Sequence, residues 1–140
     1  MFQQRAAHAY AQIGLETGVA ASSPHRLILM LYDGAMKCIT DAALHRAAGR
    51  TADKGAALSR AIAIIEEGLM GSLDVSRGGT IAAHRNELYD YMTRRLPTAI
   101  IRNDTGAMAE VRGLLGELRD AWASIDAPHA NQAARTPVLA

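Results

Sequence analysis

The chain has 140 residues, a length typical of one domain with its own core, and 15 basic residues nearly balance 14 acidic ones to leave a formal net charge of +1. This balance argues against a dedicated nucleic-acid binder, which needs a basic surface. A single cysteine excludes an internal disulfide, and no apolar run approaches the roughly 20 residues of a membrane span. The first 19 residues lack the pattern of a secretory signal. We therefore expect a soluble, cytoplasmic protein without membrane insertion.

The first 22 residues have a mixed character and precede the first clear helix. Apolar side chains are scattered among polar and small residues, and Gly14 and Gly18 discourage a stable helix. Chain ends of this kind are usually ordered only where they dock on the rest of the protein. We therefore expect residues 1–22 to form an N-terminal segment that is only partly ordered on its own.

The first helix is predicted to begin at Pro24 and to end at Ala48. Ser23 is a good N-cap because its hydroxyl can accept a hydrogen bond from a backbone N–H of the first turn, and proline suits the first helical position. Gly49 is a plausible residue to follow the helix end. Apolar residues recur at helical spacing at Leu27, Ile28, Leu31, Ala35 and Ile39.

Further apolar residues, at Leu29, Met30 and Tyr32, widen the stripe of this helix. One core seam does not need so broad an apolar face. Such a helix has to be covered on more than one side, by its own domain or by a partner. This surplus is the first indication of a binding protein.

Two more helices are predicted, one before and one after a glycine-containing turn at residues 74–80. The second helix follows the polar link 50–52, and its apolar positions are Leu58, Ile62, Ile65 and Leu69. The third helix can be capped by Thr80 and carries Leu88, Tyr89, Met92 and Leu96. Pro97 lies inside it and lacks a backbone donor, so we expect a kink or an early end there.

A fourth helix is predicted after the cap residues 103–105. Its apolar residues are spaced by three or four positions at Met108, Val111, Leu115, Leu118, Trp122 and Ile125. Residues 127–140 have no periodicity and are expected to form a disordered tail. Because short links join the helices, their neighbours should run antiparallel. The sequence thus predicts an all-α, antiparallel four-helix bundle over residues 23–126.

Residue types that could carry catalysis or bind a metal or cofactor form no convincing set. Di-metal bundles need Glu-x-x-His pairs, which are missing, and Asp41 with His45 or His84 with Glu87 is better explained as a surface pair. Cys38 lies on or near the apolar stripe and is interpreted as an inert, buried thiol. We therefore expect no catalytic residues, no metal ligands and no cofactor.

The tyrosines leave two interpretations open. Tyr32 and Asp33 are followed later in the chain by Tyr89, Asp90 and Tyr91 in a similar local sequence. A tyrosine at a helix edge can bury its ring and offer its hydroxyl to a partner at the rim of a groove. Alternatively, these rings close the core of the bundle and bond internally.

Several motifs in this order are similar to those of one protein family. They are Ser23-Pro24 followed by Leu27-Ile28 and Met30-Leu31-Tyr32-Asp33-Gly34-Ala35, Ser72-Leu73-Asp74, Gly78-Gly79, Leu88-Tyr89-Asp90-Tyr91-Met92, Arg95-Leu96 and Ala121-Trp122. Together they resemble the FliS family of flagellar secretion chaperones, over residues 10–125. The resemblance implies a cytoplasmic export chaperone that binds the C-terminal segment of flagellin, prevents its premature polymerisation and delivers it to the flagellar export apparatus.

The resemblance also implies which residues contact flagellin. The family holds its client as an extended chain with short helices in apolar grooves, and its N-terminal segment can cover part of a groove when flagellin is absent. Tyr10 with Ile13 fits that covering role here. The expected contact residues are Tyr10, Leu27, Ile28, Leu31, Tyr32, Ile62, Ile65, Tyr89 and Leu96.

Some positions differ from the family pattern. His25 and Arg26 stand where acidic or lysine-type residues are common, and Arg85 stands where the family usually has leucine. Ile100 replaces an asparagine, shortly after Pro97. These differences affect the details of the groove along the third helix and leave the predicted fold unchanged.

An alternative to the chaperone function is a bundle whose surplus apolar face is buried by self-association. Such a protein would be an adaptor for another protein partner, and the unliganded chain would form a homodimer. A mass that rises with concentration in the absence of any partner distinguishes this interpretation from the chaperone.

Overall fold

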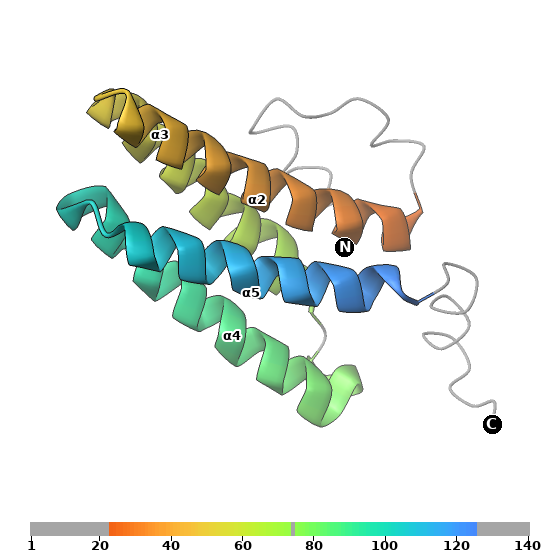
Figure 1. The fold of residues 1–140 in the computed structure, drawn as a ribbon. Helices are drawn as coiled ribbons and strands as arrows, with labels where there is room; N and C mark the ends of the chain where they lie inside the picture. The colour runs from red at the N-terminus through yellow and green to blue at the C-terminus, as the bar shows by residue number, and fades with distance from the viewer. Residues whose placement is uncertain (1–22, 74, 126–140) are drawn as a thin grey trace.

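The computed structural model describes residues 23–73 and 75–125 and contains four α-helices with no strand in these ranges. The helices are α2 (Pro24–Ala47), α3 (Thr51–Ala63), α4 (Val75–Arg102) and α5 (Thr105–Ala123). Successive helices run antiparallel and are joined by short links (Figure 1). The predicted all-α four-helix bundle is confirmed. The expected N-terminal segment with Tyr10 and the expected C-terminal tail lie outside the described residues.

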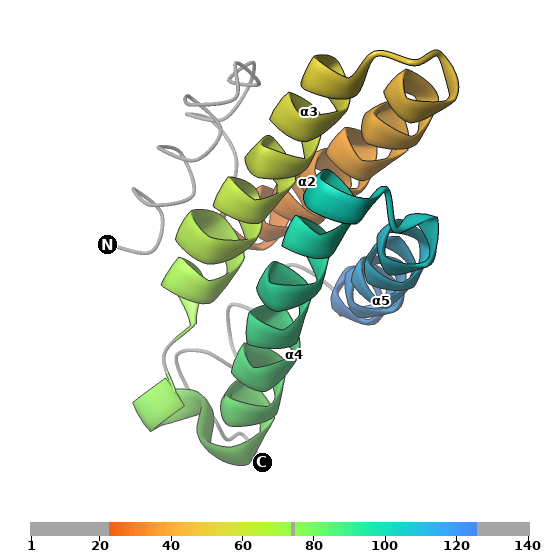
Figure 2. The same cartoon turned by 90° about the vertical axis from the view of Figure 1, so that its left-hand side faces the viewer.

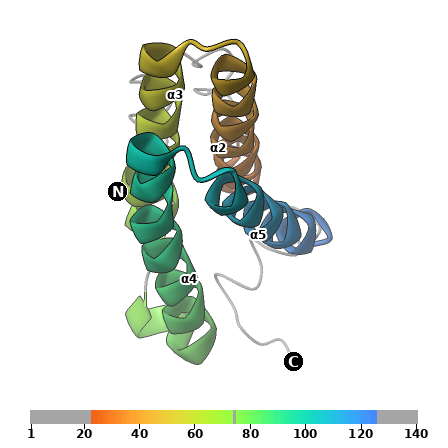
Figure 3. The same ribbon diagram turned by 60° about the vertical axis from the view of Figure 1, so that its left-hand side comes forward.

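The helices pack as a square in which each has two neighbours. Helix α2 contacts α3 and α5, and α4 contacts the same two helices from the opposite corner. Figure 2 shows the arrangement from one side of the bundle. Helices α4 and α5 diverge from the link that joins them (Figure 3). The bundle is therefore tighter at this link than at the end where α5 finishes.

The ends of α2 follow the sequence prediction closely. The Ser23 hydroxyl accepts a hydrogen bond from the Arg26 backbone N–H at 3.2 Å, and Pro24 occupies the first turn. The helix ends at Ala47, one residue earlier than predicted. Gly49 has a φ of 77°, which is the left-handed conformation that favours glycine after a helix.

Helix α3 changes its winding before it ends. A π-helix, η1 (Ile64–Leu69), and a short 3₁₀ turn, η2 (Met70–Ser72), continue its path. At Gly68 an added Cβ would lie 2.8 Å from Cδ2 of Leu31, which is fully buried in α2. Glycine therefore allows this turn to approach α2 closely. The sequence pattern did not predict the change of winding.

Helix α4 agrees with the prediction at Gly79 and differs from it at Pro97. Gly79 has non-helical angles (φ 62°, ψ −136°), so the backbone bends within the predicted turn. The helix then continues through Pro97 to Arg102, and the expected early end at Pro97 is wrong. Proline removes one backbone donor, but Leu96 and Ala99 on either side are fully buried and anchor this stretch of helix in the core.

A buried lysine joins α3 to the end of α4. Lys54 is only 1% exposed, and its ammonium group donates to the backbone oxygens of Ala99 at 2.9 Å and Ile100 at 3.2 Å and to the side-chain oxygen of Asn103. These carbonyls lie in the last turn of α4, where backbone acceptors are unpaired and a cation is favourable. Lys54 therefore serves as a C-terminal cap supplied by a different helix.

Helix α5 begins as the sequence predicts. The Asp104 carboxylate accepts a hydrogen bond from the Ala107 backbone N–H at 3.0 Å. This bond is the main reason why the pKa of Asp104 is lowered, and the nearby Arg95 lowers it further. The preceding Asn103 has a φ of 54° and makes the tight link from α4.

Candidate partner-binding surface

The structure places most of the expected contact residues in the core of the bundle. Seven are buried, with between 0% and 7% of their surface exposed: Leu27, Ile28, Leu31, Tyr32, Ile65, Tyr89 and Leu96. Ile62 keeps a partly exposed side chain that packs against this core. Tyr10 lies outside the described residues. Of the described set, Ile62 is thus the residue that reaches the surface of the free chain.

Tyr32 and Tyr89 meet inside the bundle. Their hydroxyl oxygens lie 2.5 Å apart, and the two residues are 0% and 2% exposed. Burial raises the pKa of both hydroxyls above that of a free tyrosine. In the free chain these tyrosines close the core and bond to each other. This agrees with the core-closing interpretation and not with a place at the rim of a groove.

A layer of partly buried apolar side chains covers the core and includes residues from every helix. Its members, which we call the apolar layer, are Met30, Met36, Ile62, Met70, Leu73, Leu88, Ile100, Leu114, Leu118 and Trp122. Three of them are methionines, whose flexible side chains adapt to varied partners. Because the layer extends over all four helices, it resembles the contact surface of an extended segment more than a small-molecule pocket.

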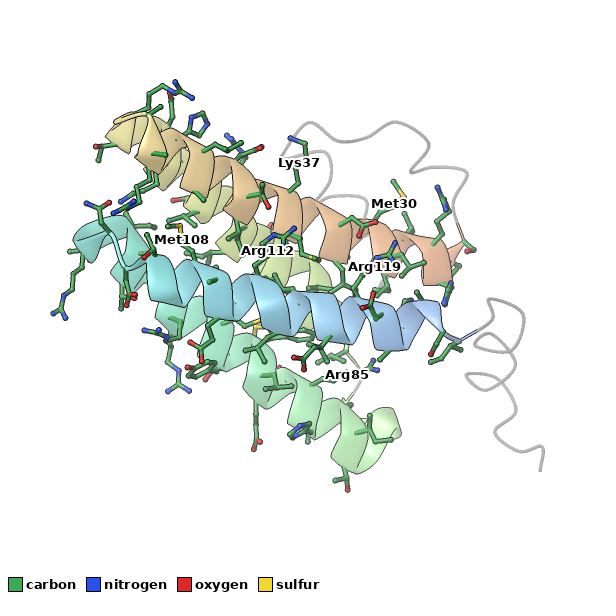
Figure 4. The ribbon with its side chains drawn as sticks, in the orientation of Figure 1. Met30, Lys37, Arg85, Met108, Arg112 and Arg119 are labelled. Atoms are coloured by element: carbon green, nitrogen blue, oxygen red, sulfur yellow. The ribbon has the colours of Figure 1, made fainter. Side chains whose placement is uncertain are left out.

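Polar pairs tie the helices together across the surface beside this layer. Arg119 of α5 pairs with Asp33 of α2 at 2.9 Å, and Arg112 donates to the Thr40 hydroxyl at 2.8 Å. Figure 4 shows both arginines beside α2, on the face that also carries Met30 and Lys37. These pairs fix the position of α5 relative to α2.

A second set of polar contacts joins α4 to α5 near their link. Glu110 accepts hydrogen bonds from the Tyr91 hydroxyl at 2.7 Å and from Arg95 at 2.9 Å. The bond from Tyr91 is the main reason why the pKa of Glu110 is lowered, and Arg95 adds to it. The second Leu-Tyr-Asp motif thus carries a buried tyrosine, Tyr89, and is followed directly by a surface tyrosine, Tyr91.

His25, Trp122 and Arg85 form a cluster at the opposite end of the bundle, and we call it the tryptophan cluster. The rings of His25 and Trp122 stack with centroids 5.2 Å apart. Trp122 Nε1 donates to the His25 carbonyl at 2.9 Å, and His25 Nε2 donates to the Trp122 carbonyl at 3.0 Å. The guanidinium carbon of Arg85 lies 5.6 Å from the centre of the Trp122 ring.

The tryptophan cluster was not predicted from the sequence. Helical spacing placed Trp122 on the apolar stripe of the fourth helix, and the structure shows a partly buried ring that packs on the core and also contacts two polar side chains. His25 and Arg85 had each been noted as departures from the family pattern. The structure shows that both departures contact the same ring, a link that the sequence alone did not signal.

Two other residues that were considered for catalysis or metal binding, Cys38 and Asp41, lie in surroundings typical of a structural role. Burial raises the pKa of the Cys38 thiol, which reduces its reactivity. Asp41 forms a surface ion pair with Lys37 at 2.9 Å. Within residues 23–73 and 75–125, no group of three His, Cys, Asp or Glu side chains could hold a metal ion. None of the described helices is both long and apolar enough to span a membrane.

Comparisons of the sequence with known proteins all match one protein family. The family model described as flagellar protein FliS matches residues 6–129. The flagellar secretion chaperone FliS of Salmonella typhimurium is 47% identical over 125 residues, which cover 89% of this chain and 93% of that protein. The Escherichia coli protein of the same name is 40% identical over 87% of this chain and 90% of its own length. The Bacillus subtilis protein of the same name is 38% identical over 76% of this chain and 78% of its own length.

Proposed function

Because the chain belongs to the FliS family of flagellar secretion chaperones, we propose that it is a cytoplasmic export chaperone for flagellin. It binds the C-terminal segment of flagellin, prevents premature polymerisation and delivers the client to the flagellar export apparatus. The observation that carries this proposal is the 47% identity to the Salmonella typhimurium chaperone over 89% of the chain.

The apolar layer supports an extended client. A disordered segment that folds on binding loses conformational entropy, so it needs contacts over a large area. The layer supplies apolar side chains on all four helices, among them Met30, Ile62, Leu88 and Leu118. An amphipathic helix can bind such a surface through residues spaced by three and four positions.

The expected contact residues contribute to client binding in two ways, by direct contact or by holding the helices in place. Ile62 contacts the client directly because part of its side chain is exposed. Buried residues such as Leu31 and Tyr32 hold the helices that carry the layer. Tyr10 covers part of the surface when no client is bound.

The test is a titration of the full chain with a peptide of the flagellin C-terminal segment, followed by calorimetry and circular dichroism. We expect saturation near one peptide per chain, a negative heat-capacity change and a gain of helix. Ile62→Ser should weaken binding severalfold. Leu44→Ser is the matched control because Leu44 is 61% exposed and lies outside the apolar layer.

Two results would contradict the proposal. A folded chain that binds neither this peptide nor full-length flagellin would exclude the chaperone function. A mass that rises with concentration, together with absence of peptide binding, would favour the self-associating adaptor and its homodimer.

A further inference from the structure

Arg85 is a partly buried cation that has no acidic partner within the described part of the chain. Two other arginines that join helices pair with carboxylates, Arg95 with Asp104 and Glu110 and Arg119 with Asp33, whereas Arg112 donates to the Thr40 hydroxyl. No carboxylate of residues 23–73 or 75–125 forms an ion pair with Arg85. Its guanidinium lies over the face of the Trp122 ring, at 5.6 Å from the centroid. Among the described residues, this partly buried guanidinium therefore has no carboxylate to balance its charge, a situation that favours binding of an anion.

The position of Arg85 suits an anion attached to an apolar chain. Its side chain projects from α4 toward α5 (Figure 4), in the region where the two helices diverge. The neighbouring members of the apolar layer on these helices are Leu88, Leu118 and Trp122. Ile81, one helical turn before Arg85, is 70% exposed. A ligand here therefore meets apolar side chains and one positive charge.

We propose that Arg85 binds the C-terminal carboxylate of the flagellin chain. This inference rests on the proposed function, because a client held by its C-terminal segment always brings one chain-end carboxylate, whatever its sequence. The planar guanidinium can donate two parallel hydrogen bonds to the two carboxylate oxygens. The last apolar side chains of the client then pack on Leu88 and Leu118. Arg85 thus fixes where the client segment ends on the bundle.

The Trp122 ring prepares Arg85 for this role. Stacking on an indole face restricts the guanidinium without using its hydrogen-bond donors, so the stack itself does not compete with a carboxylate for them. His25 holds the ring in place through the stack and the two backbone hydrogen bonds. His25 and Trp122 are therefore positioning residues, and Arg85 is the residue that contacts the client.

The test compares two forms of the flagellin C-terminal peptide, one with a free carboxylate and one with a terminal amide. For the native chain, we expect the amide to bind about tenfold more weakly, as for the loss of a charge-assisted hydrogen-bonded pair at a partly exposed site. Arg85→Gln should bind the free acid about tenfold more weakly and should not distinguish the two peptides. Trp122, the one tryptophan of the chain, should change its fluorescence with the acid more than with the amide.

Arg94→Gln is the matched control. It removes the same charge from the same helix, but Arg94 is 71% exposed and pairs with Asp90 at 3.1 Å. This variant should keep the native preference for the free acid. Circular dichroism and thermal unfolding verify that both variants are folded.

Each contrary result has a distinct meaning. An equal amide penalty in native chain and Arg85→Gln, or no penalty in the native chain, overturns the assignment of Arg85 while leaving flagellin binding intact. If replacement of an acidic side chain in the peptide abolishes the effect of Arg85→Gln, the bound anion is a side chain and the chain-end assignment is wrong. Absence of binding by either peptide to the folded native chain contradicts the proposed function itself, and the Arg85 inference with it.

Discussion

The hydroxyl groups of Tyr32 and Tyr89 lie 2.5 Å apart and connect two helices that are not neighbours in the bundle. Helices α2 and α4 occupy opposite corners of the square, so this hydrogen bond crosses its centre. Both side chains are almost completely buried, which leaves each hydroxyl dependent on the other for a partner. The pair therefore gives the core a fixed polar contact among otherwise apolar side chains.

Removal of one hydroxyl should cost more than removal of both. Tyr32→Phe or Tyr89→Phe leaves a buried hydroxyl unpaired, and each should lower the free energy of unfolding by about 1–2 kcal/mol. The double variant removes both polar groups and should be more stable than the sum of the single changes implies. Urea unfolding of the four proteins measures this coupling. Strictly additive losses would show that the hydroxyls do not depend on each other.

Alkaline pH should destabilise the protein through the same pair. Burial raises the pKa of both tyrosines in the folded chain, so they ionise first in the unfolded chain, near pH 10. Their contribution to stability is complete below that pH and is lost as pH rises above it. The free energy of unfolding should fall by up to about 1.4 kcal/mol per pH unit for each tyrosine.

Urea unfolding at several pH values on either side of pH 10 measures this slope. The control is the double variant Tyr32→Phe/Tyr89→Phe, in which the steep decline should be reduced. A slope as steep in the double variant as in the native chain would assign the alkaline instability to other groups.

Lys54→Met tests the cap on α4. Methionine retains an apolar stem of similar length but leaves the backbone oxygens of Ala99 and Ile100 without their donor. We expect the free energy of unfolding to fall by about 2 kcal/mol and amide exchange in the last turns of α4 to accelerate. Lys37→Met is the matched control because the Lys37 side chain is 67% exposed, and its unfolding midpoint should match that of the native chain. Equal behaviour of the two variants would argue against a capping role.

Two glycine substitutions should change stability in opposite directions. In Gly68→Ala the new methyl group would lie 2.8 Å from Leu31, which is fully buried in the core and would have to shift, so we expect a loss of about 1–3 kcal/mol. Gly113 lies in α5 with no atom within 4 Å of an added Cβ, and Gly113→Ala should increase stability by about 0.5–1 kcal/mol. Thermal unfolding compares the two directly. A stable Gly68→Ala variant would show that η1 does not need its close approach to α2.

Local signals in the sequence predicted the helices and several of their ends. Ser23 with Pro24 marked the start of α2, and Asp104 lay within the predicted cap of α5, because capping depends on a few adjacent residues. The passage of α4 through Pro97 was not predicted, since it depends on burial of residues from other helices. The π-helix of η1 was also missed, because it reflects the contact of Gly68 with Leu31, a residue on another helix.

The candidate surface was harder to predict than the fold. Helical spacing identifies an apolar face but does not separate core residues from those that meet a partner. Leu27 and Leu96 therefore appeared equivalent to Ile62, although the first two are fully buried and Ile62 is partly exposed. The tryptophan cluster joins His25, Arg85 and Trp122, which are far apart in the chain. A single sequence provides no signal that brings such residues together.

The position of Lys54 has a consequence for the order in which the chain folds. Lys54 belongs to the hairpin of α2 and α3, whereas its acceptors belong to α4, in the hairpin with α5. During synthesis the first hairpin emerges with this ammonium group still hydrated. Its burial becomes favourable only after the second hairpin supplies the carbonyls. The first hairpin alone therefore remains an incomplete folding unit, and the bundle gains its final stability when both halves have left the ribosome.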